Sequence, residues 1–141
     1  MSAAQARMAD ALLRTVGGRT VQIRMPASAV AGDVNEELGR ATPLFQDYPL
    51  APAVFRRLRQ RVANDGVQTE MLLSASAVNE LAVTTGQDTN SQGSAETIFR
   101  DALGVMVDGR LYELLGVTAA EAFGDVYLWR LKLRGEVNAV V

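Results

Sequence analysis

The most constraining stretch of this 141-residue chain lies near its end, where residues 126–134 read VYLWRLKLR. Apolar and basic side chains alternate there, and a period of two is typical of a β-strand with one buried face. The face that we expect to be buried carries Tyr127, Trp129, Leu131 and Leu133. The opposite, solvent-facing side carries Arg130, Lys132 and Arg134. This stretch therefore predicts a half-buried strand in an antiparallel sheet.

A second signal precedes it at residues 105–117, VMVDGRLYELLGV, where two apolar runs flank Asp108-Gly109. Asp-Gly tolerates the positive φ angles of a type I′ turn, so this stretch predicts a tight β-hairpin with Asp108 as a turn residue. Further on, Thr118 and Glu121 have the spacing of a capping box. That spacing predicts one helical turn before the next strand.

The N-terminal part predicts a helix followed by a strand. Residues 2–16 are rich in alanine, and Gly17-Gly18 supplies a stop, so we expect an N-terminal helix within residues 1–17. One apolar stripe of this helix is formed by Met8, Leu12, Leu13 and Val16. We expect it to pack on its own domain or on a neighbouring subunit. The following RTVQIRM alternates like a strand that ends at Pro26.

The middle of the chain is less regular. Residues 26–52 contain four prolines and predict a long connection with a short strand candidate at 44–48. Residues 54–62 fit either a strand or a helix. Because a strong turn signal, Asn64-Asp65-Gly66, follows, we favour a hairpin between 54–62 and 67–75, with a helix as the alternative.

Shorter helices and loops complete the prediction. Ser76 is placed to cap a short helix that ends near Leu81. Residues 84–94 contain no large apolar side chain and predict a mobile loop, whereas 95–103 fit a helix and 135–141 a tail. The expected fold is one mainly β domain, residues 1–141. It is a small antiparallel β-barrel or sandwich with an N-terminal α-helix and one or two short helices.

Composition limits the chemistry that the chain can perform. It has no cysteine and no histidine, which excludes thiolate nucleophiles, the usual zinc ligand sets and histidine acid–base catalysis. The acidic residues are scattered, and no phosphate-binding glycine motif occurs. We therefore expect no catalytic residues, no metal and no cofactor, and a protein that is not an enzyme. No apolar run approaches the roughly 20 residues that span a bilayer, so we expect no membrane partner.

Three groups of residues are candidates for binding. The basic cluster Arg56, Arg57, Arg59 and Arg61 fits a solvated face, a seam against an acidic partner, or phosphate contacts with DNA. An acidic stretch contains Asp33, Glu36 and Glu37, which fit a solvated loop better than a cation site. The large apolar side chains of the long connection, Phe45 and Tyr48, are natural anchors for a protein interface if they are exposed.

The order of these features resembles a known family. The resemblance rests on Asp108-Gly109-Arg110-Leu111-Tyr112-Glu113-Leu114 with Gly116-Val117, followed by Tyr127-Leu128, Leu131 and Leu133. This pattern, behind a short N-terminal helix, a strand and a long connection, is similar to the head-completion proteins of long-tailed bacteriophages. These proteins are also called head–tail joining, head-closure or stopper proteins. The resemblance covers the last third of the chain, and the middle matches in element order.

The resemblance implies a structural virion protein of the phage neck, made in the host cytoplasm. Such proteins form rings, often six- or twelve-fold, that close the DNA-filled head and dock the tail. The implied partners are further copies of the chain, the portal or connector protein and a tail terminator or tail tube protein, with packaged DNA in the lumen as a further contact. The alternatives are a tail terminator or another small neck or tail protein, and a small nucleic-acid-binding barrel that uses Arg56 to Arg61.

Overall fold

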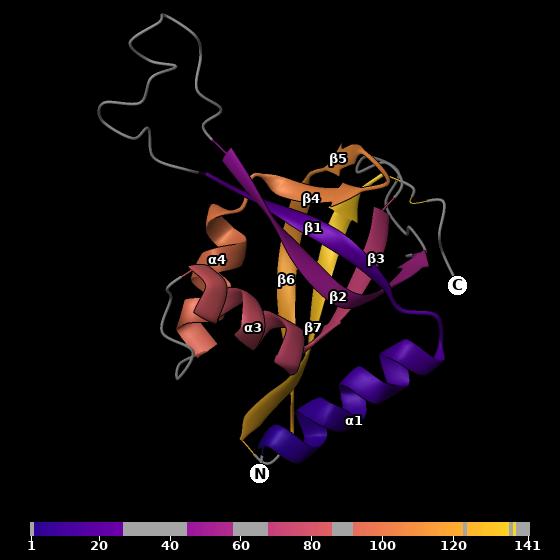
Figure 1. Ribbon diagram of the computed structural model, residues 1–141, viewed down its shortest axis with the longest axis vertical. Coiled ribbons are helices and arrows are strands. Elements are labelled where there is room, and N and C mark those ends of the chain that lie inside the picture. The colour runs from indigo at the N-terminus through magenta and orange to yellow at the C-terminus, as the bar shows by residue number, and fades with distance from the viewer. Residues whose placement is uncertain are drawn as a thin grey trace, which may run out of the picture.

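The computed structural model describes residues 2–26, 45–57, 68–85, 92–122, 124–135 and 137 (Figure 1). These residues form a mainly β fold with an N-terminal helix and two further short helices, as predicted. The elements are α1 (Ser2–Thr15), β1 (Arg19–Pro26), β2 (Phe45–Arg57), β3 (Gln68–Ser74), α3 (Ala75–Thr85), α4 (Gln92–Asp101), β4 (Gly104–Val107), β5 (Arg110–Tyr112), β6 (Leu114–Ala122) and β7 (Asp125–Arg134).

The described strands form one antiparallel sheet in the order β5-β4-β1-β2-β3-β7-β6. The sheet does not close into a barrel, so the sandwich form of the prediction is the correct one. The chain passes from β5 at one edge to β6 at the other with only Glu113 between them. The backbone N–H of Arg134 donates to the carbonyl oxygen of Glu113 at 3.0 Å and holds this crossing against β7.

The last strand confirms the predicted faces. Trp129, Leu131 and Leu133 are buried on the inner face of the sheet, and Tyr127 is half-buried. The basic side chains of the same strand, Arg130, Lys132 and Arg134, are exposed on the outer face. Helices α3 and α4 cover the inner face, where the Phe99 ring of α4 lies 5.6 Å from that of Trp129. The core therefore sits between the curled sheet and these two helices (Figure 1).

The Asp108-Gly109 hairpin is confirmed. Asp108 has φ 52° and Gly109 φ 80°, the two positive values that a type I′ turn requires, and Val107 pairs with Arg110. The helical turn predicted from Thr118 and Glu121 is wrong. Both residues belong to β6, where Thr118 pairs with Arg130. The backbone N–H and C=O groups of this segment find their hydrogen-bond partners on β7, so no helical turn is needed to satisfy them.

Helix α1 ends as predicted. Gly17 has φ 92°, its N–H donates to the Arg14 carbonyl, and the N–H of Gly18 donates to the Leu13 carbonyl at 2.8 Å. These two bonds form a Schellman motif, which satisfies carbonyls at the end of the helix.

The predicted boundaries of α3 and α4 need correction. The cap of α3 is Ser74, whose Oγ accepts from the Ala77 N–H at 3.2 Å, and not Ser76. The helix continues past Leu81 to Thr85, and α4 begins at Gln92. Both ends of the predicted loop 84–94 are therefore helical, because apolar residues of α3 and α4 pack on the core, and residues 86–91 lie outside the described residues.

The long connection predicted at 26–52 is also shorter than expected. Strand β2 begins at Phe45 and includes Pro49 and Pro52, because residues 45–53 pair with β1. The hairpin with the following strand is confirmed where it is described, from Ala53 opposite Leu73 to Arg57 opposite Thr69. Residues 27–44 and 58–67 lie outside the described residues.

The predicted tail, residues 135–141, is anchored at its start. Thr69 Oγ1 donates to the Gly135 carbonyl at 2.8 Å and accepts from the Val137 N–H at 3.3 Å. Val137 is buried in the core cluster, so this part of the tail belongs to the folded body.

Candidate interaction surfaces

The structure describes four of the candidate interface residues: Phe45, Tyr48, Arg56 and Arg57. The other candidates, Arg59, Arg61, Asp33, Glu36 and Glu37, lie outside the described residues. Of the two predicted aromatic anchors, Phe45 is 40% exposed, whereas Tyr48 is half-buried and packs against the core.

Phe45 belongs to a polar and aromatic cluster on the outer face of β1 and β2. The guanidinium carbon of Arg24 lies 3.8 Å above the centre of the Phe45 ring. The same guanidinium binds Asp47 through two bonds, Nε to Oδ1 at 2.9 Å and Nη2 to Oδ2 at 3.2 Å. These hydrogen bonds raise the pKa of Arg24 above its ordinary value. The cluster holds Phe45 in place while leaving part of its ring exposed.

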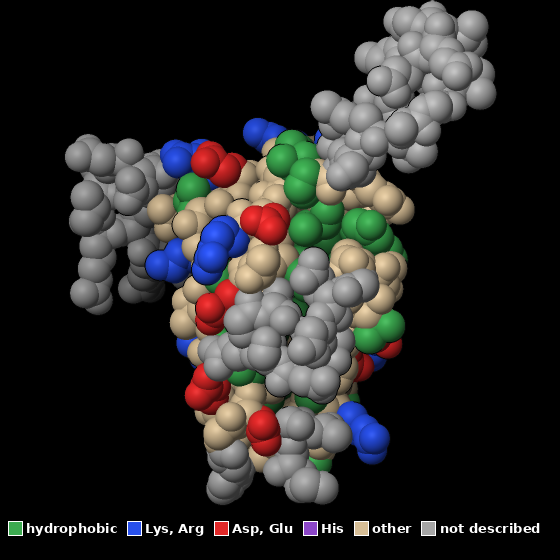
Figure 2. Space-filling view, turned by 90° about the vertical axis from the view of Figure 1, so that its left-hand side faces the viewer, with side chains coloured by type: hydrophobic (Ala, Val, Ile, Leu, Met, Phe, Trp, Pro, Cys, Tyr) green, Lys and Arg blue, Asp and Glu red, His purple; other side chains and the backbone are tan. Residues whose placement is uncertain are grey.

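Apolar surface gathers around the ends of β1 and β2, as the green atoms in the upper part of Figure 2 show. The backbone N–H of Leu103 donates to the Arg24 carbonyl at 2.7 Å, which brings the half-exposed Leu103 side chain to this end of the sheet. We call the exposed Phe45 and Leu103 the upper apolar patch. Met25 and Tyr48 of the same strand ends are half-buried on the other face of the sheet and pack against the core.

The second apolar surface lies on α1, and it differs from the predicted stripe. The helix packs on the body through the small residues Ala6 and Ala9 together with Leu13. Met8 and Leu12, which were expected to be part of the packing stripe, are 65% and 63% exposed, and Val16 is exposed as well. The packing side of the helix therefore carries Leu13 and small residues, whereas Met8, Leu12 and Val16 face solvent.

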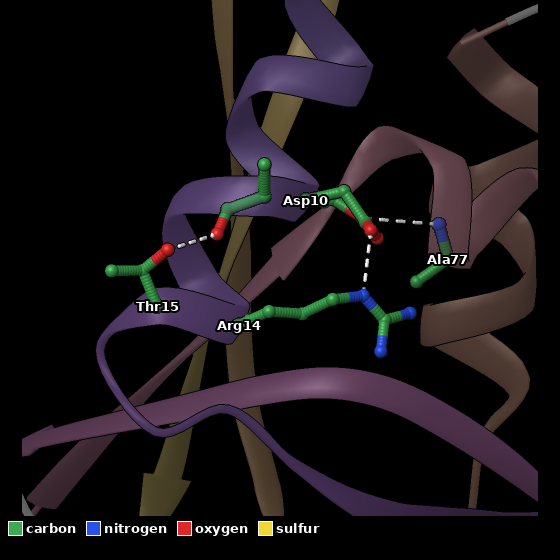
Figure 3. Close-up of polar contacts among 6 residues, drawn as sticks. Asp10, Arg14, Thr15 and Ala77 are labelled. Carbon is green, nitrogen blue, oxygen red and sulfur yellow. Dashed lines mark hydrogen bonds and ion pairs between the residues drawn. The ribbon is translucent and has the colours of Figure 1, made fainter.

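Polar contacts between α1 and the start of α3 set this rotation (Figure 3). Ser74 Oγ donates to Asp10 Oδ1 at 3.0 Å, and Arg14 Nε donates to Asp10 Oδ2 at 2.8 Å. The Ser74 bond holds the Asp10 side of the helix against the start of α3, and the Arg14 bond, which lies within α1, keeps the Asp10 carboxylate in place. On the opposite side, a groove of about 340 Å³ runs between α1 and the β6–β7 hairpin. It is lined by Gln5, Met8, Ala9, Leu12, Leu13, Ala122, Tyr127 and Leu128.

The basic residues form a third surface. Arg56 binds Glu70 of the neighbouring strand, with Nε to Oε2 at 2.8 Å, and the Glu70 side chain is only 7% exposed. Glu70 in turn lies opposite Lys132 of β7. The order β2-β3-β7 thus brings Arg56 close to the basic residues of the last strand, although some 75 positions separate them in sequence. Both groups of basic residues are visible in the sequence, but their proximity is not, because alternation within a strand does not indicate which strands are neighbours in the sheet.

The described residues contain no group of three or more histidine, cysteine, aspartate or glutamate side chains that could hold a metal ion. Among the described helices, none has both the length and the apolar character to cross a membrane.

Comparison with known proteins adds no relative: no family model, no curated protein and no solved structure matches this chain.

Proposed function

We propose that this chain is a structural virion protein of the neck of a long-tailed bacteriophage, without a catalytic role. In this role it forms a ring between the portal and the tail, closes the DNA-filled head and docks the tail. The proposal starts from the sequence pattern at Asp108–Leu114 and Tyr127–Leu133, which resembles head-completion proteins. The antiparallel sandwich with an N-terminal helix is compatible with that resemblance.

The observation that carries the proposal is the presence of two separate apolar surfaces on one small chain. The outward face of α1, with Met8 and Leu12, lies at one end of the molecule, and the upper apolar patch at the other (Figure 1). A closed ring uses head-to-tail contacts, in which two different surfaces of each subunit meet. Exposed large apolar side chains of this kind are typical of protein interfaces. Both surfaces are therefore suited to contacts with a neighbouring copy or with the adjoining ring.

The test is the mass of the full-length protein, measured by mass photometry alone and with the portal protein encoded in the same genome. We expect ring-sized species, at least when the portal is present. Leu12→Glu should abolish them, since it places a charge in the α1 contact. Ala11→Glu, an exposed neighbour on the same helix, should leave them intact.

A monomer under every condition, or equal behaviour of the two variants, would contradict the ring. Binding to the tail tube protein without binding to the portal would instead favour the tail-terminator role.

A further inference from the structure

We infer that the outer face of β2, β3 and β7 is a binding site for the phosphate backbone of double-stranded DNA. This basic face consists of Arg56, Arg130, Lys132 and Arg134, with the carboxylates Glu70 and Glu113 beside them. The inference does not depend on the neck role, because it concerns the isolated chain.

The arrangement of charge is the first argument. Four cations stand against two carboxylates on this face, in a chain whose formal net charge is −2. The Glu70 carboxylate is almost fully buried and bound to Arg56, and Glu113 is bound to Arg134, so each carboxylate is already compensated. The side chains of Arg130 and Lys132 are exposed and make no hydrogen bond or ion pair with any residue that the structure describes. These two cations remain available to a ligand.

The spacing of the cations is the second argument. Alternate residues on a strand repeat at roughly 6.7 Å, so the three cations of β7 form a row with that period. Phosphates of one DNA strand rise about 3.4 Å each along the helix axis and also turn around it, so neighbouring phosphates lie about 7 Å apart in space and the row matches successive phosphates. Arg56 lies two strands away, roughly 10 Å across the sheet, and its long side chain widens the contact.

The surroundings of these cations favour a nucleic acid over a protein partner. Protein interfaces are built around exposed aromatic and large apolar anchors, with arginine enriched and lysine depleted among their residues. On β6, the small residues Gly116 and Thr118 lie opposite Lys132 and Arg130. On β3, Glu70 lies opposite Lys132 and the half-buried Leu72 lies opposite Arg130, and Val54 beyond it on β2 is buried. The exposed apolar groups Met8 and Leu12 belong to α1, and Phe45 to the far end of β2. A polyanion such as DNA can pair with the charges of this face without needing apolar contacts.

The test is the salt dependence of binding between the full-length protein and a DNA duplex of about 30 base pairs, followed by fluorescence anisotropy from about 25 to 200 mM salt. We expect binding at low salt and a slope of log K against log salt of about −2 to −4, because each phosphate contact contributes about −0.9. The double variant Arg130→Gln/Lys132→Gln should weaken binding and reduce the magnitude of this slope by about 1.8.

The matched control is Arg7→Gln/Arg100→Gln. It removes the same charge from two exposed arginines on α1 and α4, neither of which has a side-chain partner among the described residues. This variant should keep the slope of the parent protein, and a thermal melt should show both variants folded. Three results would overturn the inference: no binding at the lowest salt, an equal loss in both double variants, or binding to poly-glutamate without binding to the duplex. The last of these would point to an acidic protein partner.

Discussion

At the scale of single residues, Ser74 joins three elements. It ends β3, and its Oγ accepts from the Ala77 N–H as the cap of α3 while donating to Asp10 of α1. A hydroxyl can do both, because it carries one donor and two acceptor lone pairs. The sequence prediction placed the cap at Ser76 because it extended the preceding strand to residue 75, which left Ser74 inside that strand. Only the position where the strand stops distinguishes them.

This difference gives a direct prediction. Ser74→Ala should lower the free energy of unfolding by about 1–2 kcal/mol, because the cap of α3 and the donor to Asp10 are both lost. Ser76→Ala should change it by less than about 0.5 kcal/mol. Urea unfolding of the two variants measures both values. If Ser76→Ala lowered the free energy of unfolding more than Ser74→Ala, Ser76 would be the cap, as predicted from the sequence.

At the scale of elements, α1 has two apolar sides with different roles. Leu13 is buried between the helix and the sheet, and its neighbour Leu12 is exposed beside the groove at the β6–β7 hairpin. Periodicity placed both leucines in one stripe, since they differ by only about 100° around the helix axis. In the structure, the side with Leu13, Ala6 and Ala9 turns inward, and the contact of Asp10 with Ser74 fits this rotation.

We expect Leu13→Ala to cost about 2–4 kcal/mol of unfolding free energy, the range for a truncated core leucine. Leu12→Ala should stay within about 0.5 kcal/mol, because its side chain already contacts water in the monomer. Guanidinium unfolding of dilute protein checks both. If Leu12→Ala cost as much as Leu13→Ala under conditions where the protein is monomeric, the described rotation of α1 would be wrong.

At the scale of the whole molecule, distant parts of the chain share one core. Trp129 of β7 lies against Phe99 of α4, and Val137 near the C-terminus is buried in the same cluster as Val21 and Ile23 of β1. β1 pairs with both β2 and β4, so the sheet depends on contacts between the N-terminal and C-terminal parts of the chain. We therefore expect the molecule to unfold as one cooperative unit.

The single tryptophan, Trp129, is a fluorescent probe with which cooperative unfolding can be measured. Denaturation followed by Trp129 fluorescence should give the same midpoint as denaturation followed by far-UV circular dichroism, since the helices and the sheet lose their structure together. A separate, earlier transition in circular dichroism would show that the helices unfold independently of the sheet, and the shared core would then not govern stability.

The local elements that could be predicted from the sequence are those whose signals are short-range. The alternation at Trp129 to Leu133, the Asp108-Gly109 turn and the stop at Gly17-Gly18 all depend on neighbouring residues, and the structure confirms each. The helical turn expected at Thr118 failed because a long-range partner, β7, supplied the same hydrogen bonds. Likewise, which side of α1 is buried and which cations lie together follow from strand order and helix docking. Only the tertiary structure decides these features, because contacts between residues far apart in the chain depend on packing that no local pattern encodes.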